Sequence, residues 1–337
     1  MNIAVVGIGV MGRRHLEIIR NLGLRLVGIC DARPEALREA QDKFQLPAAV
    51  LYTDARRMLA ETKPEALIVS TTASSHCLYT CLGAEHGARY ILCEKPMGIS
   101  IEECDRMIET CAAHGVKLAI NHPIRYMEQY REAKRIVQSP EFGGLSSIAV
   151  ITGNCGVSMN GVHYFEMFRY MNGEPPVEVT AWLSGQETAN PRGAQYEDHA
   201  GSVRLTTASG KRLYVEMGAD QGHGVKMIYS GRCGQLLVDE LAQTMSLTVR
   251  HEQYRNMPTI RNGLPHADSV QKISLTGTLE STQRVLQALL NDDRPPSGAE
   301  GRLAVLVLVA AHVSHERRRT VQLTDPDLPR TRTFRWA

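Results

Sequence analysis

IAVVGIGVMG, residues 3–12, decides the fold because it joins an apolar run directly to three glycines spaced GxGxxG. The run at residues 3–6 is typical of a buried strand, and the helical spacing of the apolar residues after the glycines predicts a helix. In such a turn Gly7 permits the tight bend, Gly9 lets a ligand approach the backbone, and Gly12 lets helix and strand pack closely. The helix N-terminus offers free N–H groups and a positive dipole end. The stretch therefore predicts a site for the pyrophosphate of a dinucleotide.

Asp31 stands nineteen residues after Gly12, directly after the apolar run at residues 25–30. A carboxylate at this place can accept hydrogen bonds from both hydroxyl groups of an adenosine ribose, which favours NAD. Arg33 can stack on adenine or meet a 2′-phosphate, so NADP stays open as the cofactor. The alternative is a purely structural turn, in which Asp31 caps the helix that begins near Pro34.

The first 120 residues alternate short β-branched runs with longer amphipathic stretches, which is typical of repeated βαβ units. Strands are expected at residues 3–6, 25–30, 66–70, 89–93 and 116–120, with a weaker one near Val50. Helices are expected to begin near Met11, Pro34, Asp54, Ser74 and Ile101. The strands lack polar alternation, which favours a parallel sheet covered on both faces. Residues 1–121 are therefore predicted to form a doubly wound, dinucleotide-binding Rossmann domain.

After about residue 140 the pattern changes to longer segments in which polar and apolar residues alternate between turn residues. Strands are expected at residues 146–152, 177–183, 201–207, 212–217, 225–229 and 235–238, and helices at 161–171, 279–290 and 300–317. This pattern predicts an α/β domain with an open, mainly antiparallel sheet over residues 122–323. Residues 324–337, which are rich in Pro and Arg, are expected to form a surface tail.

The composition is ordinary for a globular protein, with 43% hydrophobic and 22% charged residues and a formal charge of +2 over 337 residues. No global field therefore favours nucleic acid or a membrane surface as a partner. The most apolar stretch, residues 303–313, is shorter than the ~20 residues that span a bilayer, and the first residues lack a signal-peptide pattern. A cytoplasmic protein is expected. The eight cysteines include no CxxC pair, so they are interpreted as reduced thiols, and no metal site is predicted.

Glu94, Lys95 and Pro96 directly follow the strand expected at residues 89–93. They therefore lie at the carboxyl edge of the sheet, where doubly wound folds bind ligands. Pro96 biases Lys95 towards an extended backbone that can project its amine from that edge. Partly desolvated and beside a positively charged nicotinamide ring, this amine should have a lowered pKa and exchange a proton with a reacting oxygen. The alternative is an ordinary surface lysine in a loop.

Together the glycine turn and the EKP tripeptide resemble the glucose-fructose oxidoreductase, inositol dehydrogenase and MocA (Gfo/Idh/MocA) family. The resemblance extends across nearly the whole chain, through TTASSH at residues 71–76, Asn121, Arg125 and GVH at residues 161–163. It implies a Rossmann domain followed by an α/β domain whose open sheet forms homodimers or homotetramers. It also implies hydride transfer between the nicotinamide and a secondary alcohol of a sugar, cyclitol or sugar derivative.

Carried over by position, the resemblance assigns residues to the cofactor and to a sugar-like substrate. The cofactor set is Gly7, Gly9, Val10, Met11 and Gly12 at the pyrophosphate, Asp31 at the ribose, Thr71, Thr72 and His76 at its flank, and Glu94, Lys95 and Asn121 at its nicotinamide half. Arg33 joins this set because of the adenine or 2′-phosphate contact that its guanidinium can make. The substrate set is Lys95, Arg125, Asn160 and His163, of which Lys95 and His163 form the catalytic pair. An imidazole suits a base that takes the hydroxyl proton as hydride leaves the same carbon. A core histidine bonded to a backbone carbonyl is the alternative for His163.

The sequence departs from the family pattern at two places. Met159 stands where many relatives carry an acid four residues before the histidine, while Glu166 represents a second common acid further along. Thr72 and Ala73 replace the Pro-Asn that commonly follows Thr71. Two other functions therefore stay open: a hydrolase or lyase that retains NAD and works through transient oxidation, and a non-catalytic protein that senses the dinucleotide.

Overall fold

The computed structural model describes residues 1–188 and 190–336, which form two compact units. The first unit comprises Met1–Pro123, Thr278–Val305 and Pro329–Ala337, and the second unit comprises Ile124–Gly277 and Leu306–Leu328. Both units are thus assembled from separate stretches of chain. The sequence interpretation placed the helix near residues 279–290 in the second domain, whereas the structure includes it in the first unit.

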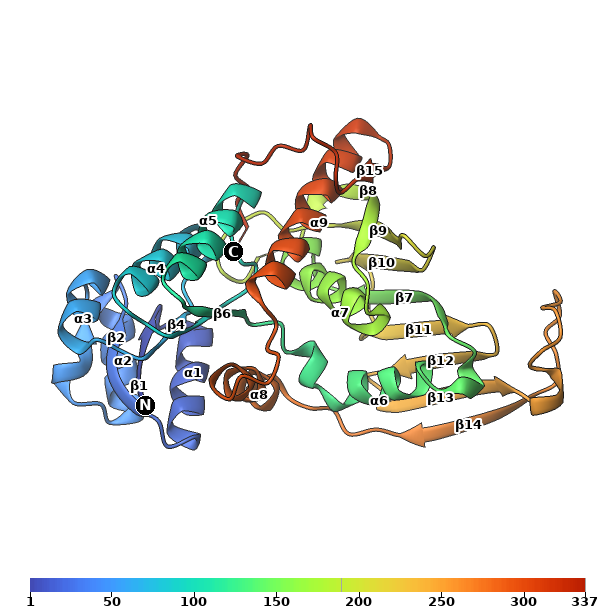
Figure 1. Cartoon of the computed structure of the whole chain (residues 1–337), viewed down its shortest axis with the longest axis horizontal. Coiled ribbons are helices and arrows are strands. Elements are labelled where there is room, and N and C mark those ends of the chain that lie inside the picture. Colours follow the sequence, from blue (N-terminus) through green and yellow to red (C-terminus); the bar gives the residue numbers. More distant parts are fainter. Residues whose placement is uncertain (189, 337) are drawn as a thin grey trace. The chain divides into compact units, whose positions relative to one another are not determined.

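The first unit is built on a six-stranded parallel sheet with the order β3-β2-β1-β4-β5-β6 (Figure 1). Its strands are β1 (Asn2–Val6), β2 (Arg25–Cys30), β3 (Leu51–Tyr52), β4 (Ala66–Val69), β5 (Tyr90–Cys93) and β6 (Lys117–Ile120). The helices between them are α1 (Val10–Asn21), α2 (Pro34–Phe44), α3 (Ala55–Thr62), α4 (Ala73–Glu85) and α5 (Ile101–Ala113). The predicted strands and the doubly wound fold are confirmed. The strand order reverses between β1 and β4, and ligands of such sheets bind at the carboxyl side of this point.

The chemistry of the residues explains these elements. Every residue of β4 is buried, as expected for a strand covered on both faces. Asp54 is the N-cap of α3, and its carboxylate accepts hydrogen bonds from the N–H groups of Arg56 at 2.8 Å and Arg57 at 3.2 Å. Ser100 caps α5 in the same way by accepting from the Glu103 N–H at 3.1 Å. Such side chains satisfy donors that the first helical turn leaves without partners.

Two late segments complete the first unit. Helix α8 (Thr278–Leu290) and the beginning of α9 (Gly298–Arg317) belong to it, and Ser297 forms a bridge to Ala119 in β6. The expected surface tail is wrong for its final aromatic residues. Trp336 is 1% exposed and stacks on Phe334 with ring centroids 4.6 Å apart. The sequence interpretation took the Pro and Arg content as decisive and overlooked these two rings, whose apolar area favours burial.

The second unit contains a nine-stranded sheet with the order β14-β13-β12-β11-β7-β10-β9-β8-β15 (Figure 1). Its strands are β7 (Leu145–Gly153), β8 (Pro176–Glu187), β9 (His199–Thr207), β10 (Arg212–Gly218), β11 (Lys226–Gly231), β12 (Gly234–Asp239), β13 (Thr244–Arg250), β14 (His266–Lys272) and β15 (Val321–Gln322). Strands β7 and β10 pair in parallel and the other neighbours are antiparallel. The predicted open, mainly antiparallel sheet is confirmed, although β13, β14 and β15 were not foreseen.

The two faces of this sheet differ. Helices α6 (Glu128–Val137) and α7 (Val162–Asn172) pack against one face, where Leu213 and Val215 are buried. The strand register places Ile151, Trp182 and Tyr214 together on the other face, where they are 39%, 62% and 43% exposed. Among the described residues, no helix combines the length and apolar character needed to cross a membrane.

Candidate functional site

The glycine turn joins β1 to α1, and its three glycines differ in what surrounds them. Gly7 has a φ of +90°, and a Cβ there would lie 2.5 Å from the backbone nitrogen of Thr71. A Cβ on Gly12 would lie 2.0 Å from the carbonyl oxygen of Gly7. A Cβ on Gly9 meets no atom within 4 Å. The fold itself therefore requires Gly7 and Gly12, whereas Gly9 faces open space at the N-terminus of α1, where a phosphate can approach.

This difference predicts opposite outcomes for two alanine substitutions. Gly9→Ala should leave the melting temperature unchanged, because nothing in the protein meets the new methyl group, yet lower NAD affinity by roughly tenfold or more where the backbone must approach the pyrophosphate. Gly12→Ala should lower the melting temperature, because helix α1 would be pushed away from the turn. Thermal unfolding and calorimetric titration with NAD measure both. Equal NAD affinity in Gly9→Ala and the wild type would contradict the assignment of the turn.

Asp31 lies at the end of β2, and its carboxylate is part of the same loop. One oxygen accepts a hydrogen bond from the Ile8 N–H at 2.7 Å, and the other accepts from the Arg33 N–H at 2.9 Å. The side chain of Asp31 is 9% exposed, whereas that of Arg33 is 68% exposed. The N-cap of α2 is Arg33, so Asp31 does not cap that helix directly. Oδ1 also accepts from the Arg33 Nε–H at 3.4 Å, whereas Oδ2 accepts, among the described residues, only from Ile8 and keeps a lone pair for a ribose hydroxyl.

His76 is predicted at the flank of the cofactor, and in the structure its side chain is buried between two backbone carbonyl groups. Its Nδ1 lies 2.9 Å from the carbonyl oxygen of Pro96, and its Nε2 lies 3.1 Å from that of Thr71. The ring is 0% exposed. Thr72 is the N-cap of α4. His76 therefore ties the end of β4 to the loop that follows Lys95.

Glu94 is also buried, at 2% exposure, and it organises the segment before Lys95. Its Oε1 lies 2.8 Å from His15 Nε2 and accepts from the side-chain amide of Asn121 at 2.8 Å. Burial alone would raise the pKa of Glu94, but the hydrogen bond and charge of His15, the Asn121 amide and the Lys95 charge lower it to about 2. Glu94 is therefore a buried, negatively charged carboxylate held by hydrogen bonds directly before Lys95. The peptide bond between Lys95 and Pro96 is cis.

This network links stability to pH. The folded pKa of Glu94 is depressed below its ordinary value of 4.5, so its stabilisation is fully present above that value and is lost as the pH falls towards 2. We expect Glu94→Gln to be less stable than the wild type at pH 7, with a difference that shrinks as the pH falls through this window. Urea unfolding at several pH values measures it. A difference that stays constant down to pH 3 would contradict the charged state of Glu94.

In the second unit, a π-helical turn at Val157–Gly161 leads directly into α7, which carries His163 near its start. Asp198 is 2% exposed, and its Oδ1 accepts hydrogen bonds from the N–H groups of Ser158 at 2.8 Å and Met159 at 3.2 Å. A Cβ on Gly156 would lie 2.2 Å from the carboxyl carbon of Asp198. Although position 159 carries no acid, a carboxylate from another part of the chain therefore holds the backbone that presents Asn160 and His163.

Arg125, predicted to contact substrate, lies in a buried ion pair. Its guanidinium bonds to the carboxylate of Glu166 on α7, and the two side chains are 9% and 0% exposed. The guanidinium also lies over the ring of Tyr170, 5.3 Å from its centroid, while the Lys134 amine lies 3.5 Å from the same centroid. The structure thus brings Arg125 together with Glu166, three residues after His163. Contact between Arg125 and substrate stays a prediction.

The predicted residues divide between the two units. The cofactor set and Lys95 belong to the first unit, and Arg125, Asn160 and His163 belong to the second. Sequence reasoning missed His15 and Asp198. His15 stands with Gly12, Leu16 and Ile19 on the buried stripe of α1, and a histidine at such a position signals a buried partner. Asp198 carries no local signal, because its partners are about forty residues away.

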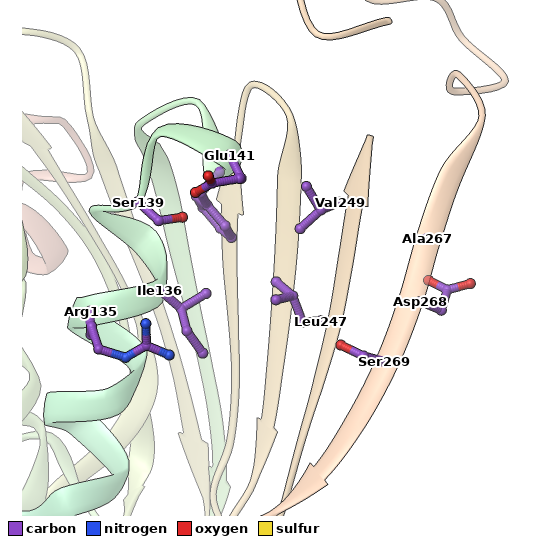
Figure 2. A pocket seen from close by; sticks show the side chains of 10 residues that line it. Arg135, Ile136, Ser139, Glu141, Leu247, Val249, Ala267, Asp268 and Ser269 are labelled. Atoms are coloured by element: carbon purple, nitrogen blue, oxygen red, sulfur yellow. The ribbon is translucent and has the colours of Figure 1, made fainter. Parts of the chain in front are cut away.

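A cavity of about 340 Å³ lies in the second unit between α6 and strands β13 and β14 (Figure 2). Its lining includes Arg135, Ile136, Phe142, Leu247 and Asp268 and none of the predicted site residues. Within residues 1–188 and 190–336, no group of three or more His, Cys, Asp or Glu side chains is arranged to hold a metal ion.

Comparison with known proteins agrees with this geometry. Residues 1–122 match the model of a family described as an oxidoreductase family with an NAD-binding Rossmann fold. The chain is 28% identical over 233 residues to inositol 2-dehydrogenase of Burkholderia lata, covering 64% of this chain and 67% of that one. It is 24% identical to myo-inositol 2-dehydrogenase of Thermotoga maritima, covering 96% and 99%. An oxidoreductase from Agrobacterium radiobacter, solved with NAD⁺, L-tartaric acid and magnesium, shares the fold at 18% identity with a TM-score of 0.79, covering 96% of this chain and 98% of that one.

Proposed function

Because this chain belongs to the Gfo/Idh/MocA family of NAD-binding oxidoreductases, we propose that it transfers a hydride between NAD and a secondary alcohol of a sugar, cyclitol or sugar derivative. The observation that carries the proposal is the common sheet edge of the first unit. The glycine turn after β1, Asp31 after β2 and Lys95 after β5 all follow parallel strands, so they lie at the carboxyl side of one sheet.

The residues present fit NAD. Gly9 leaves room beside the N-terminus of α1, and Asp31 Oδ2 offers a lone pair to a ribose hydroxyl. Arg33 extends into solvent and lies 3.4 Å from Asp31, with which it forms an ion pair. Because the Asp31 carboxylate would repel a 2′-phosphate, NAD is preferred to NADP. When bound, the nicotinamide accepts or returns the hydride.

In this proposal Lys95 and His163 handle the proton. Lys95 donates a hydrogen bond to the substrate oxygen and orients the alcohol. His163 takes the hydroxyl proton as the carbon loses its hydride, and returns it in the reverse direction. Glu94 and Asp198 hold the two backbones from which these side chains extend. Because Lys95 and His163 belong to different units, their joint action is a prediction that variants of each must test.

The sequence identity of 28% and 24% to two inositol dehydrogenases makes cyclitols the first compounds to test as substrates. We expect the purified protein to reduce NAD with one member of a panel of cyclitols, sugars and sugar acids, measured by nicotinamide absorbance. Exchange of substrate hydrogen with solvent, without net NAD reduction, would instead indicate a hydrolase or lyase that works through transient oxidation. Tight NAD binding with neither reaction would indicate a sensor, and absence of NAD binding would contradict the proposal.

The same family likeness supports assembly of identical chains through the second unit. Ile151, Trp182 and Tyr214 offer an apolar patch on the face of the sheet that α6 and α7 leave uncovered. Exposed patches of this kind mark interaction sites. We propose a homodimer or homotetramer, which the mass of the purified protein in solution tests.

A further inference from the structure

Strand β14 lies at one edge of the nine-stranded sheet (Figure 1). It pairs with β13 on its inner side, and no strand of the described chain pairs with its outer side. All seven residues of β14 are exposed, and the apolar side chain of Val270 is 69% exposed. Such an edge offers a row of unpaired N–H and C=O groups to another strand. None of these residues has a part in the proposed hydride transfer.

The pairing with β13 determines which backbone groups of β14 face outward. At one end of the ladder the Ile273 N–H donates to the Gln243 carbonyl oxygen at 3.0 Å, and at the other end the N–H of residue 251 donates to the carbonyl oxygen of residue 265 at 3.1 Å. Only every second residue of an antiparallel strand bonds to a given neighbour. The odd-numbered residues of β14 therefore bond to β13. The N–H and C=O groups of its even-numbered residues point away from the sheet.

Three of the even-numbered residues carry a symmetric pattern of charge. Asp268, Val270 and Lys272 lie on one face of β14, because side chains alternate between the faces of a strand. Asp268 accepts a hydrogen bond from the Thr248 hydroxyl at 2.6 Å, and the Lys272 amine donates to the carbonyl oxygen of Ala242 at 3.3 Å. An acid and a base thus lie two residues before and two residues after the apolar Val270.

We propose that β14 pairs in antiparallel orientation with β14 of a second copy of this chain, about a two-fold axis at Val270. In this register Val270 lies opposite its own counterpart, and each Asp268 lies opposite the Lys272 of the other copy. The backbone groups of all these residues face outward, so each opposing pair exchanges both hydrogen bonds. Opposite charges on neighbouring strands add stability. The surface is self-complementary, as a two-fold interface between identical chains requires.

Neighbouring registers are less favourable. An axis at Asp268 places two carboxylates opposite each other, and an axis at Ser269 places Asp268 opposite the apolar Val270 and His266 opposite Lys272. The charge pattern therefore selects the axis at Val270. In many proteins charges at an edge strand keep other strands away, and that use of Asp268 and Lys272 predicts no association at this edge.

The β14 edge is separate from the apolar patch of Ile151, Trp182 and Tyr214. A two-fold axis perpendicular to the sheet joins two sheets in one plane and leaves both open faces on the same side. Two such joined pairs can stack through the patch, which gives a homotetramer. This step rests on the assembly through the patch that is part of the proposed function, whereas the pairing at β14 does not.

The mass of the full-length protein in solution, measured by sedimentation equilibrium, tests the edge. Val270→Pro removes only an outward-facing N–H, which an edge strand tolerates, so β14 should remain paired with β13. We expect this variant to assemble to half the mass of the wild type, while Val270→Thr, which keeps the N–H, assembles as the wild type does. A monomeric wild type, or equal masses of the wild type and Val270→Pro, would overturn the proposal.

Charge exchange tests the register. Lys272→Asp and Asp268→Lys each place like charges opposite one another and should weaken the association by about tenfold. The double variant with both changes restores opposite charges across the interface and should recover most of the wild-type affinity. A double variant that associates no more tightly than the single variants contradicts the register.

Cross-linking tests the axis directly. Residues opposite each other in a bonded antiparallel pair have Cα atoms about 5.5 Å apart, within the range of a disulfide. Oxidised Val270→Cys should therefore run as a covalent dimer on a non-reducing gel, whereas Gln271→Cys and the wild type should not. Trp182→Ser should reduce the tetramer to dimers that Val270→Cys still cross-links. A tetramer that survives Trp182→Ser contradicts only the patch, and absence of the Val270→Cys dimer overturns the pairing at β14.

Discussion

Lys95→Ala is expected to reduce kcat by about 10²- to 10⁴-fold for the substrate that the panel of cyclitols, sugars and sugar acids identifies. This is the usual contribution of a positioned acid or base. Without the amine, the alcohol oxygen loses both its orientation and a hydrogen-bond donor as the proton leaves. The Glu94 network lies behind this residue and does not depend on the Lys95 side chain for its hydrogen bonds, so the fold should persist. Steady-state kinetics with saturating NAD measures the loss.

Two further variants sharpen this result. Lys95→Met keeps most of the aliphatic stem, so a loss of kcat equal to that of Lys95→Ala would identify the amine as the cause. Lys43→Ala removes an exposed lysine on α2 of the same unit and should leave kcat unchanged. If Lys95→Ala turned over substrate as fast as the wild type, the catalytic assignment of Lys95 would be wrong.

Arg125→Ala is expected to lower the free energy of unfolding by about 3–5 kcal/mol, the usual result of removing one partner of a buried ion pair. Glu166, 0% exposed, would be left as a buried charge without its guanidinium. Tyr170 would lose one of the two cations that lie over its ring. Urea or guanidinium unfolding measures the change. Replacing both partners by apolar residues, Arg125→Met with Glu166→Leu, should cost less than either single change.

Arg135 supplies the matched control, since it pairs with Glu132 at the surface of α6 and its side chain is 70% exposed. Arg135→Ala should leave the free energy of unfolding nearly unchanged because exposed pairs contribute little. The comparison also separates two roles of Arg125. If its main role were to bind substrate, Arg125→Ala would raise KM without destabilising the protein. A purely structural role would lower the yield of folded enzyme and leave the KM of the folded fraction unchanged.

The sequence predicts the first unit well because its signals are local. The glycine turn, Asp31 and the EKP tripeptide each lie within a few residues of the strand that positions them, so spacing alone predicts their common edge. Helix α8 shows the limit of such reasoning. Its apolar face predicts a helix, but nothing in residues 278–290 indicates which of the two sheets the helix packs against.

In the candidate site, too, the residues with local sequence signals could be predicted, and those that depend on distant contacts could not. Lys95 and His163 could be named from short motifs and a family resemblance, whereas the residues that hold them could not. Asp198 reaches the backbone of Ser158 and Met159 across about forty residues, and such a contact exists only once the sheet has formed. Strand β14 was missed because all its residues are exposed, so it lacks the alternation of buried and exposed positions that predicts a strand.

The bridge between Ala119 and Ser297 has a consequence for how the chain is made. Strand β6 is the last strand of the first sheet, and its outer edge is paired by residues 296 and 297. A ribosome that adds roughly 5–20 residues per second needs about ten to thirty-five seconds to travel from β6 to that segment. During this interval the nascent sheet has an open edge, the kind of surface that recruits other strands. Until residue 297 has left the ribosome, the outer edge of β6 therefore lacks the partner that its own chain supplies in the folded protein.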